Sequence, residues 1–423
     1  MLFRNGLFTS ESVSGGHPDK VCDQISDAIL DAFLRLDPHA RVACQCFAAD
    51  RKVLVAGEFR TRDEQHFRQV RDSAADIVRK TLRDVGYGTA EYDIDPKSCE
   101  VEIRFNHQSP QIAASVDRSD AILGAGDQGL MFGYATDETE SLMPLSWSLA
   151  TELLVAGWSL RDGAGFPLKP DAKSQVTVSY EEGKPVGVDA AVLSWQHQPG
   201  IPIDDVRGFL QSEILDRVIP PHRRTRNFRA YLNPAGAWTI GGPKADTGLT
   251  GKKIIVDTYG GACPHGGGSF SGKDPSKVDR SGAYAARHVA KHVVAAGLAR
   301  RCTVQLSYAI GQAEPVSLGV DLHGTGQVSE ERMVRAIAEV FDLTPGAIIH
   351  ELDLLRPIYQ GTATFGHFGQ WRDPKIYLWE ATPRIAELRA AFGMAAPAHG
   401  RSGSGPGTLP ADDSNARAAA SHA

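Results

Sequence analysis

The chain has 423 residues, of which 42% are hydrophobic and 23% are charged. This composition is that of an ordinary globular protein, and the length is sufficient for two or three domains. The formal net charge of −6 argues against a general nucleic-acid-binding protein, so clusters of basic residues are expected to be local sites.

Neither the cysteines nor the hydrophobic segments point to a secreted or membrane protein. No segment approaches about 18 uninterrupted apolar residues, and the first six residues lack the apolar core of a signal peptide. The six cysteines form no Cys-x-x-Cys pair, which disfavours a disulfide framework and a zinc site. We therefore expect a soluble cytoplasmic protein that binds neither membranes nor nucleic acids.

A helix start preceded by glycines opens the informative part of the chain. Pro18 suits the first helical position, and apolar residues from Val21 to Leu36 recur on one face. His17 and Asp19 therefore lie at the entry to this helix. A lone His-Pro-Asp is usually a capping arrangement. A second helix start in the chain also follows glycines and carries an aspartate, Asp279, and the two together favour a shared metal–phosphate site.

The remaining elements repeat in a regular order. The first unit continues with strands over 41–47 and 52–61, a helix over 64–85 and a strand over 99–105. The second unit has a glycine-rich segment at 124–129, a helix over 139–156, strands over 176–180 and 187–196, and a helix over 204–217. The third has a buried strand at 253–256, a helix over 275–299 capped by Asp274, strands over 302–310 and 315–323, and a helix over 329–342.

The order of a long helix, strands and a second helix thus recurs three times, at intervals of roughly 130 residues. This predicts an α+β fold of three pseudo-symmetric modules, each a mostly antiparallel sheet with helices on one side. We place the modules at 1–110, 111–238 and 239–394. The composition of 395–423 predicts a disordered tail. Periodicity also fails between 106 and 120, which indicates a long mobile loop of the kind that forms lids.

The glycine-rich loop between 257 and 280 is the most informative stretch. Its glycines let the backbone turn tightly and approach a ligand closely. The loop leads to Lys273, and the following helix start carries Lys277 and Asp279. Backbone N–H groups, two ammonium groups and a carboxylate together suit a polyphosphate and its magnesium ion.

Short motifs within this loop allow other interpretations. Residues 267–273 fit G-x-x-x-x-G-K, but Asp274 follows where a P-loop phosphotransferase needs Ser or Thr. The sequence His265-Gly266-Gly267-Gly268 is similar to the oxyanion loop of an esterase, but no G-x-S-x-G occurs in the chain. A glycine-rich turn with solvated lysines is the remaining alternative.

Four motifs together resemble the methionine adenosyltransferase (S-adenosylmethionine synthetase) family. They are Gly16-His17-Pro18-Asp19-Lys20, Gly124-Ala125-Gly126-Asp127-Gln128-Gly129, Pro170-Asp171-Ala172-Lys173-Ser174-Gln175-Val176 and His265-Gly266-Gly267-Gly268-Ser269-Phe270-Ser271-Gly272-Lys273-Asp274. The resemblance covers about 7–380, nearly everything except the tail. It implies three pseudo-symmetric α+β domains, in agreement with the repeat.

The resemblance also implies a reaction and its residues. The sulfur of L-methionine attacks C5′ of ATP, and the tripolyphosphate formed is hydrolysed to diphosphate and phosphate. The leaving group carries about four negative charges, so cations must hold it. The implied catalytic residues are His17, Lys173, Lys252, Lys253 and Lys273. The implied ATP-binding residues are His17, Asp171, Lys173, Trp238, Asp246, Lys252, Lys253, Ser269 and Lys273. The implied methionine-binding residues are Glu58, Gln108, Asp246 and Lys277, with Asp127 completing the pocket.

Metal ions and partners follow from the same resemblance. Asp19 and Asp279 would bind two Mg²⁺ ions per site, and Gln45 stands where the family has a Glu that helps to hold K⁺. The family's site lies between two subunits, so a dimer or tetramer is expected.

Other departures from the family pattern are Lys252 for Arg, Trp238 for Phe, Ser269 for Ala, Gln111 for Asp, and Gly15 for Glu. We predict an S-adenosylmethionine synthetase. The alternative is a paralogue that regulates a genuine synthetase, against which the retained lysines and aspartates argue.

Overall fold

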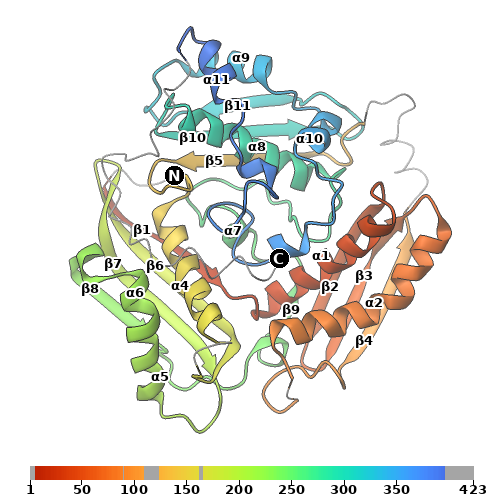
Figure 1. Ribbon diagram of the computed structural model, residues 1–423, viewed down its shortest axis with the longest axis vertical. Helices are drawn as coiled ribbons and strands as arrows, with labels where there is room; N and C mark the ends of the chain where they lie inside the picture. The colour runs from red at the N-terminus through yellow and green to blue at the C-terminus, as the bar shows by residue number, and fades with distance from the viewer. Residues whose placement is uncertain (1–4, 89, 109–122, 162–164, 396–423) are drawn as a thin grey trace.

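The protein has three lobes around a common centre, each built on one β-sheet (Figure 1). The computed structural model describes residues 5–88, 90–108, 123–161 and 165–395. The predicted tail and most of the predicted lid loop lie outside these residues. The strands are β1 (Gly6–Val13), β2 (Arg41–Ala49), β3 (Lys52–Arg60), β4 (Glu100–His107), β5 (Gly129–Thr136), β6 (Leu168–Glu181), β7 (Lys184–His197), β8 (Arg224–Leu232), β9 (Gly248–Leu249), β10 (Arg301–Tyr308) and β11 (Ser317–Asp321).

Helices connect and cover the strands. They are α1 (Pro18–Leu36), α2 (Glu64–Val85), α4 (Leu145–Arg161), α5 (Ile203–Phe209), α6 (Asp216–Val218), α7 (Ile254–Asp257), α8 (Val278–Ala295), α9 (Glu330–Val340), α10 (Pro345–Glu351) and α11 (Ile385–Ala390). A π-helical segment, η1 (Leu210–Leu215), joins α5 to α6, and 3-10 turns are η2 (Pro221–Arg223), η3 (Gly242–Lys244), η4 (Gln360–Thr362) and η5 (Leu378–Glu380). None of the described helices is long and apolar enough to cross a lipid bilayer.

The sheets confirm the predicted α+β class. Their strand orders are β1-β6-β7-β8, β4-β3-β2-β9 and β11-β10-β5. Neighbours are antiparallel except for the pairs β3–β4 and β7–β8. Helix α4 packs on β1 and β6, α1 on β2, and α8 on β5 and β10. Apolar residues that recur on one face of α1, such as Val21, Ile25 and Ile29, are fully buried in this packing, as their spacing predicted.

The sheets are interleaved along the chain, because several strands pair outside the sequence unit in which they occur. Strand β1 pairs along its whole length with β6, and β5 pairs with β10. Strand β9 adds to β2. Strands β1, β5, β8 and β9 were not predicted from the sequence. The boundaries at 110, 238 and 394 stay a prediction, but the lobes exchange strands across the first two of them.

Two local predictions in the glycine-loop region were wrong. The predicted strand at 253–256 is the short helix α7. Both ends of this helix are held against α1, Lys253 by an ion pair with Asp19 and Asp257 by an ion pair with Lys20. The predicted cap at Asp274 is also displaced, because α8 begins at Val278 with Lys277 as its N-cap. The Asp274 carboxylate instead accepts hydrogen bonds from the amides of Val42 and Ser276, which tie the turn to β2.

Three further boundaries differ from the prediction. The helix predicted over 204–217 contains the π-helical segment η1, and the helix predicted over 139–156 is displaced to 145–161. The segment predicted to precede a strand at 176 is already part of β6, which begins at 168.

A buried ion cluster attaches η5 to α8. Glu380 accepts hydrogen bonds from Arg287 Nε at 2.9 Å and from Lys291 Nζ at 2.6 Å, and it is 3% exposed. Removing one member of a buried ion pair leaves an uncompensated charge, which costs about 3–5 kcal/mol. We expect Glu380→Gln to lower the free energy of unfolding by about that amount, measured by urea denaturation.

The matched control for this prediction is Asp137→Asn. Asp137 pairs with Arg300 at 2.7 Å on the surface, where both side chains are more than one-third exposed. Exposed pairs contribute about 0–1 kcal/mol. Similar urea midpoints for the two variants would contradict the assigned role of the Glu380 cluster.

Candidate active site

His17 is held as a neutral imidazole whose proton is on Nε2. It caps α1, and its Nδ1 accepts a hydrogen bond from the Asp19 amide at 3.2 Å. Burial and the nearby Lys253 lower the pKa of His17 to about 2. The accepting Nδ1 carries no proton, so Nε2 is the N–H donor. This Nε2 is buried and has no partner among the described residues, so it is free to donate to a bound molecule.

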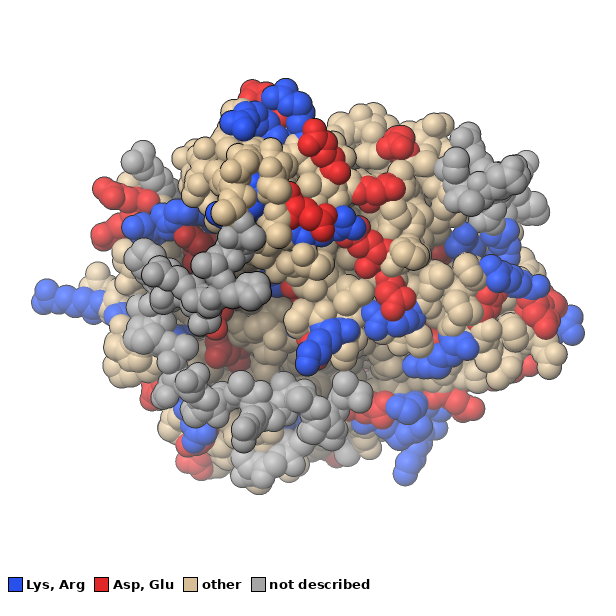
Figure 2. Space-filling model, turned by 45° about the horizontal axis from the view of Figure 1, so that its top comes forward, with Lys and Arg blue, Asp and Glu red and all other residues tan. Residues whose placement is uncertain are grey.

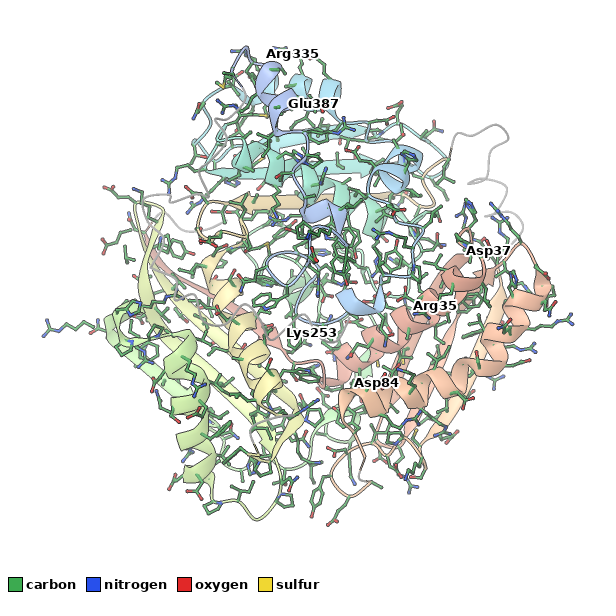
Figure 3. All side chains as sticks on the ribbon, in the orientation of Figure 1. Arg35, Asp37, Asp84, Lys253, Arg335 and Glu387 are labelled. Carbon is green, nitrogen blue, oxygen red and sulfur yellow. The ribbon has the colours of Figure 1, made fainter. Side chains whose placement is uncertain are left out.

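Asp19 gathers two lysines from the loop after β9. Its Oδ2 accepts from Lys253 Nζ at 2.6 Å, and Lys252 Nζ lies 3.8 Å from Oδ1. Oδ1 also accepts from the Leu249 amide at 3.0 Å. Lys253 lies near the middle of the molecule, between the lobes (Figure 3). The first turn of α1 therefore holds a carboxylate between two ammonium groups.

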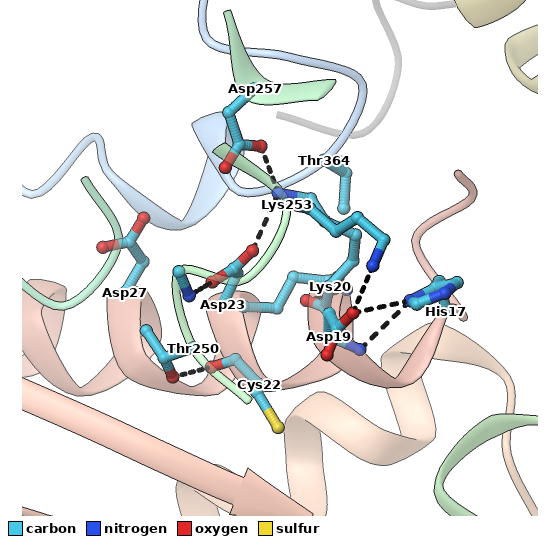
Figure 4. Close-up of polar contacts among 12 residues, drawn as sticks. His17, Asp19, Lys20, Cys22, Asp23, Asp27, Thr250, Lys253, Asp257 and Thr364 are labelled. Atoms are coloured by element: carbon cyan, nitrogen blue, oxygen red, sulfur yellow. Dashed lines mark hydrogen bonds and ion pairs between the residues drawn. The ribbon is translucent and has the colours of Figure 1, made fainter. Parts of the chain in front are cut away.

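A buried ion cluster beneath Asp19 fixes this loop at both ends (Figure 4). The fully buried Lys20 donates to Asp23 at 2.9 Å and to Asp257 at the end of α7. Asp23 also accepts from the amide of Gly251, just before the two lysines, at 2.8 Å. Burial raises the pKa of Asp23 to about 7 even though Lys20 opposes the shift. The loop is thus attached to α1 on either side of Lys252.

Asp171 and Lys173 bring β6 to the same place. Asp171 Oδ2 accepts from the Gly242 amide at 2.8 Å, while its buried Oδ1 has no partner among the described residues. Burial raises the pKa of Asp171 to about 7. Lys173 is exposed on β6 and lowers the pKa of His17. A Cβ on Gly16 would lie 2.4 Å from Pro170, so glycine is needed where α1 meets β6.

The predicted nucleoside-binding residues Trp238 and Asp246 lie on either side of Gly242, whose amide binds Asp171. The Trp238 amide donates to His197 Nε2 at 3.1 Å, and its indole Nε1 donates to the Ile240 carbonyl at 2.8 Å. Asp246 is exposed and contributes to the raised pKa of Asp171. We name His17, Asp19, Lys252, Lys253 and their neighbours on β6 the first cluster.

A second cluster surrounds the start of α8. Lys273 Nζ donates to Asp279 Oδ2 at 2.5 Å. A Cβ on Gly268 would lie 2.2 Å from Asp279 Oδ1, and one on Gly129 would lie 3.2 Å from it. The glycines thus leave the carboxylate room between the glycine loop and the start of β5. Asp127 lies two residues before Gly129, exposed, with its side chain accepting from the amide of the next residue.

The predicted methionine contacts adjoin this second cluster. Ala43 on β2 pairs with Glu58 on one side and with Lys273 on the other. Two strand spacings, about 9.6 Å, therefore separate the Glu58 and Lys273 backbones. Gln108 follows β4, donates its amide to the Phe59 carbonyl and has a buried Oε1 with no partner among the described residues.

Three predicted residues occupy less direct positions. Lys277 is paired with the buried Asp274, whose pKa is held below its usual value by Lys277 and Arg41 although burial opposes this. Ser269 lies against Gly251, where a Cβ on the glycine would be 2.3 Å from that of Ser269. Gln45 is exposed in the middle of β2.

The two clusters remain separate within one chain. In the described parts of the chain, no hydrogen bond or ion pair joins Asp19 to Asp279, and no group of three His, Cys, Asp or Glu side chains could hold a metal ion. Magnesium in proteins is commonly held by one or two carboxylates plus substrate phosphates. Asp19 and Asp279 therefore fit magnesium as single carboxylates that a phosphate ligand would complement.

Four residues near these clusters were not predicted as site residues. Lys20, Asp23 and Asp257 form the buried support, and His265 lies at the start of the glycine loop. The spacing of Lys20 and Asp23 on a helix could have indicated their ion pair. Nothing local linked either of them to Asp257, which lies more than 200 residues away.

Charged side chains of both signs are interspersed on the face in Figure 2, in keeping with the low net charge.

The chain matches three profiles of one known family in order. They are the N-terminal domain of S-adenosylmethionine synthetase over residues 5–110, its central domain over 122–238 and its C-terminal domain over 240–381. An S-adenosylmethionine synthase of Desulforudis audaxviator is 51% identical over 396 residues, covering 91% of this chain and 98% of that protein. One from Wolinella succinogenes is 49% identical over 389 residues, covering 92% and 98%.

The raised pKa of Asp171 predicts a pH-dependent stability difference. An unfolded Asp releases its proton near pH 4, whereas native Asp171 keeps it until about pH 7. Between these values the native state binds more protons, so its stability falls as pH rises, by up to about 1.4 kcal/mol per pH unit. Asp171→Asn removes this dependence. We expect the variant to gain stability relative to wild type from about pH 5 to pH 7, measured by urea midpoints.

Asp204→Asn, at an exposed position on α5, is the control and should show a constant difference. A constant difference for Asp171→Asn as well would contradict the assigned pKa.

Proposed function

The chain belongs to the S-adenosylmethionine synthetase family, and we propose that it forms S-adenosylmethionine from ATP and L-methionine. The sulfur of methionine bonds to C5′ of ATP as the C5′–O bond breaks and tripolyphosphate leaves with the electron pair. The observation that carries this proposal is the neutral His17 with an unpartnered Nε2–H, set among lysines of the first cluster.

His17 would donate a hydrogen bond to the leaving oxygen. Its strongly lowered pKa means that it keeps one ring proton and does not act as an imidazolium acid. Tripolyphosphate is stable as an anion, so the departing oxygen needs charge stabilisation and no proton. A fixed N–H donor supplies that stabilisation without reorganising.

The lysines would hold the triphosphate through both half-reactions. Lys173, Lys252 and Lys253 lie in the first cluster, and Lys273 lies in the second. In the second half-reaction the oxygen of water bonds to a terminal phosphorus as a bridging P–O bond breaks. The products are diphosphate and phosphate, which take up the proton of water. Paired ammonium groups stabilise the charge that develops on the bridging oxygen.

Enzymes of this family use a divalent metal and a monovalent cation. We propose that Asp19 and Asp279 hold magnesium, because each offers a single carboxylate among ammonium groups. Bound magnesium would neutralise charge on the phosphates. Gln45 offers a carbonyl dipole toward potassium in place of a charge.

The remaining predicted residues would bind the two substrates. Glu58, Gln108 and Lys277 would bind methionine beside the second cluster. Asp171 Oδ1 would accept from the nucleoside, with Trp238 stacking on adenine. Asp246 would contact both substrates, Ser269 would contact ATP and Asp127 would complete the pocket. The unpartnered, buried Oδ1 of Asp171 and Oε1 of Gln108 support these roles, since buried polar atoms normally have partners.

We also propose that each site combines the first cluster of one subunit with the second cluster of another. The faces of the sheets away from α1, α4 and α8 carry exposed apolar side chains, including Leu7, Phe47, Leu130 and Leu249. These lie on strands of all three sheets, and Phe47 is paired with Leu249. A second copy of the chain packed against these sheet faces would bury the exposed apolar side chains and form a dimer or tetramer. The predicted cytoplasmic location is part of the same proposal.

Incubating the purified protein with ATP, magnesium and methionine tests the function directly. We expect S-adenosylmethionine, diphosphate and phosphate in equal amounts. A regulatory paralogue would form none, and a P-loop phosphotransferase would transfer a phosphoryl group and leave methionine unalkylated.

Mixed oligomers test the shared site. Asp19→Asn and Asp279→Asn should each abolish synthesis at saturating magnesium, because each removes a charged oxygen ligand. In a dimer carrying one subunit of each kind, one of the two sites regains both aspartates. Random pairing makes half of the dimers mixed, so co-refolded variants should recover about a quarter of wild-type activity.

Asp19→Asn refolded alone is the control and should stay inactive. No recovery in the mixture would show that each site is built from one chain.

Because position 45 is Gln and not Glu, we predict that potassium activates the enzyme only weakly. A carboxylate there would add a charge–charge attraction of several kcal/mol at an effective dielectric of ~20. We expect wild-type turnover to change little when sodium chloride is replaced by potassium chloride, and Gln45→Glu to become potassium-dependent. Gln69→Glu, exposed on α2, is the matched control. Strong potassium activation of wild type, unchanged in Gln45→Glu, would refute this role.

A further inference from the structure

The two clusters contain the same arrangement of a histidine. In the first, His17 Nδ1 accepts from the amide two residues later, that of Asp19. In the second, His265 Nδ1 accepts from the amide two residues later, that of Gly267, at 2.8 Å. Each backbone amide occupies Nδ1 of its ring, so a neutral ring carries its proton on Nε2. Both rings therefore present an N–H donor on the side away from the backbone.

His265 lies beside the carboxylate of the second cluster. It lines a hollow together with Asp279, Gly266 and Gly268, where the glycine loop meets β5 and α8. A Cβ on Gly266 would lie 1.7 Å from the Leu130 carbonyl oxygen, so the loop after His265 packs tightly on the start of β5. In the described part of the chain, His265 Nε2 has no hydrogen-bond partner. A half-buried donor thus faces a carboxylate-lined hollow at a glycine loop.

We propose that His265 binds the triphosphate, donating Nε2–H to a phosphate oxygen held at the second cluster. This inference rests on the proposed function and extends it. The anion in the site is then approached by one neutral imidazole from each cluster, His17 at the leaving oxygen and His265 farther along the phosphate chain. A ring whose Nδ1 is occupied and whose Nε2 is protonated is a donor, which excludes direct ligation of magnesium by His265.

The competing role for His265 is purely structural, because Nδ1 also fixes the conformation of the glycine loop. Two amide substitutions separate the roles. The amide of Asn reaches the position of Nδ1 and can still accept from Gly267, but it has no group at Nε2. The amide of Gln reaches the position of Nε2 and can still donate there, but it leaves the Gly267 amide without its acceptor.

The experiment measures binding of diimidotriphosphate, a tripolyphosphate analogue whose NH bridges resist hydrolysis. Isothermal titration calorimetry with magnesium gives its Kd for wild type, His265→Asn, His265→Gln and the control His222→Asn, an exposed histidine in η2. We expect His265→Asn to raise Kd roughly tenfold, the effect of one hydrogen bond to a charged group. His265→Gln should retain more of the affinity, and the control should equal wild type. Hydrolysis of tripolyphosphate should slow in the same order.

The opposite order, with His265→Asn like wild type and His265→Gln impaired, would overturn the proposal and leave a structural role. Wild-type affinity in both variants would overturn it as well. Failure of the proposed function is distinguishable, since wild type would then form no S-adenosylmethionine, whatever the Kd values. Urea midpoints of the variants show whether any loss of affinity comes from unfolding.

Discussion

The candidate site depends on one buried cation, Lys20. Its ammonium group lies fully buried between the carboxylates of Asp23 and Asp257, which come from α1 and from the end of α7. Without Lys20, two buried carboxylates would face each other, an arrangement that is costly in a low-dielectric interior. Because Asp23 also binds the Gly251 amide, the ion cluster holds both ends of the segment that carries Lys252 and Lys253. The position of the two lysines that we propose bind phosphate thus depends on buried residues to which no substrate contact is assigned.

The lysines of the first cluster influence both its charge and the protonation of His17. Lys252 and Lys253 lie beside Asp19, while Lys173 lies near His17 and Asp171, and these three ammonium groups suit an anionic ligand. Burial of the ring is the main reason why the pKa of His17 is lowered and the ring stays neutral, and the same lysines add to this effect because they would repel a further positive charge. The neutral donor and its cationic surroundings are therefore linked through the same lysines, in addition to the effect of burial.

Sequence reasoning predicted what is encoded locally and missed what depends on distant partners. The amphipathic pattern of α1 and α2 predicted both helices, and four motifs indicated the family and most of the proposed site residues. The β-branched run at 253–256 looked like a buried strand, but its ends are fixed by Asp19 and Lys20 from another part of the chain. Strands β1 and β5 escaped prediction because their pairing partners lie more than 150 residues away. Which cluster each site residue joins likewise depends on tertiary contacts, such as the pairing of Ala43 with both Glu58 and Lys273.

The exchange of strands has a consequence for how the chain is made. During translation the first strand emerges long before its neighbour, because Gly6 pairs with Tyr180 and Val13 with Lys173. Strand β2 can pair with β9 only after Gly248 and Leu249 have been synthesised. Strand β5 can pair with β10 only after residues 301–308 have been synthesised. No sheet can be completed until its late strand has left the ribosome, so the nascent polypeptide carries unpaired strand edges through much of synthesis. Such edges promote aggregation, so the interval between the synthesis of a strand and that of its neighbour is the period in which the chain is most exposed to pairing with other chains.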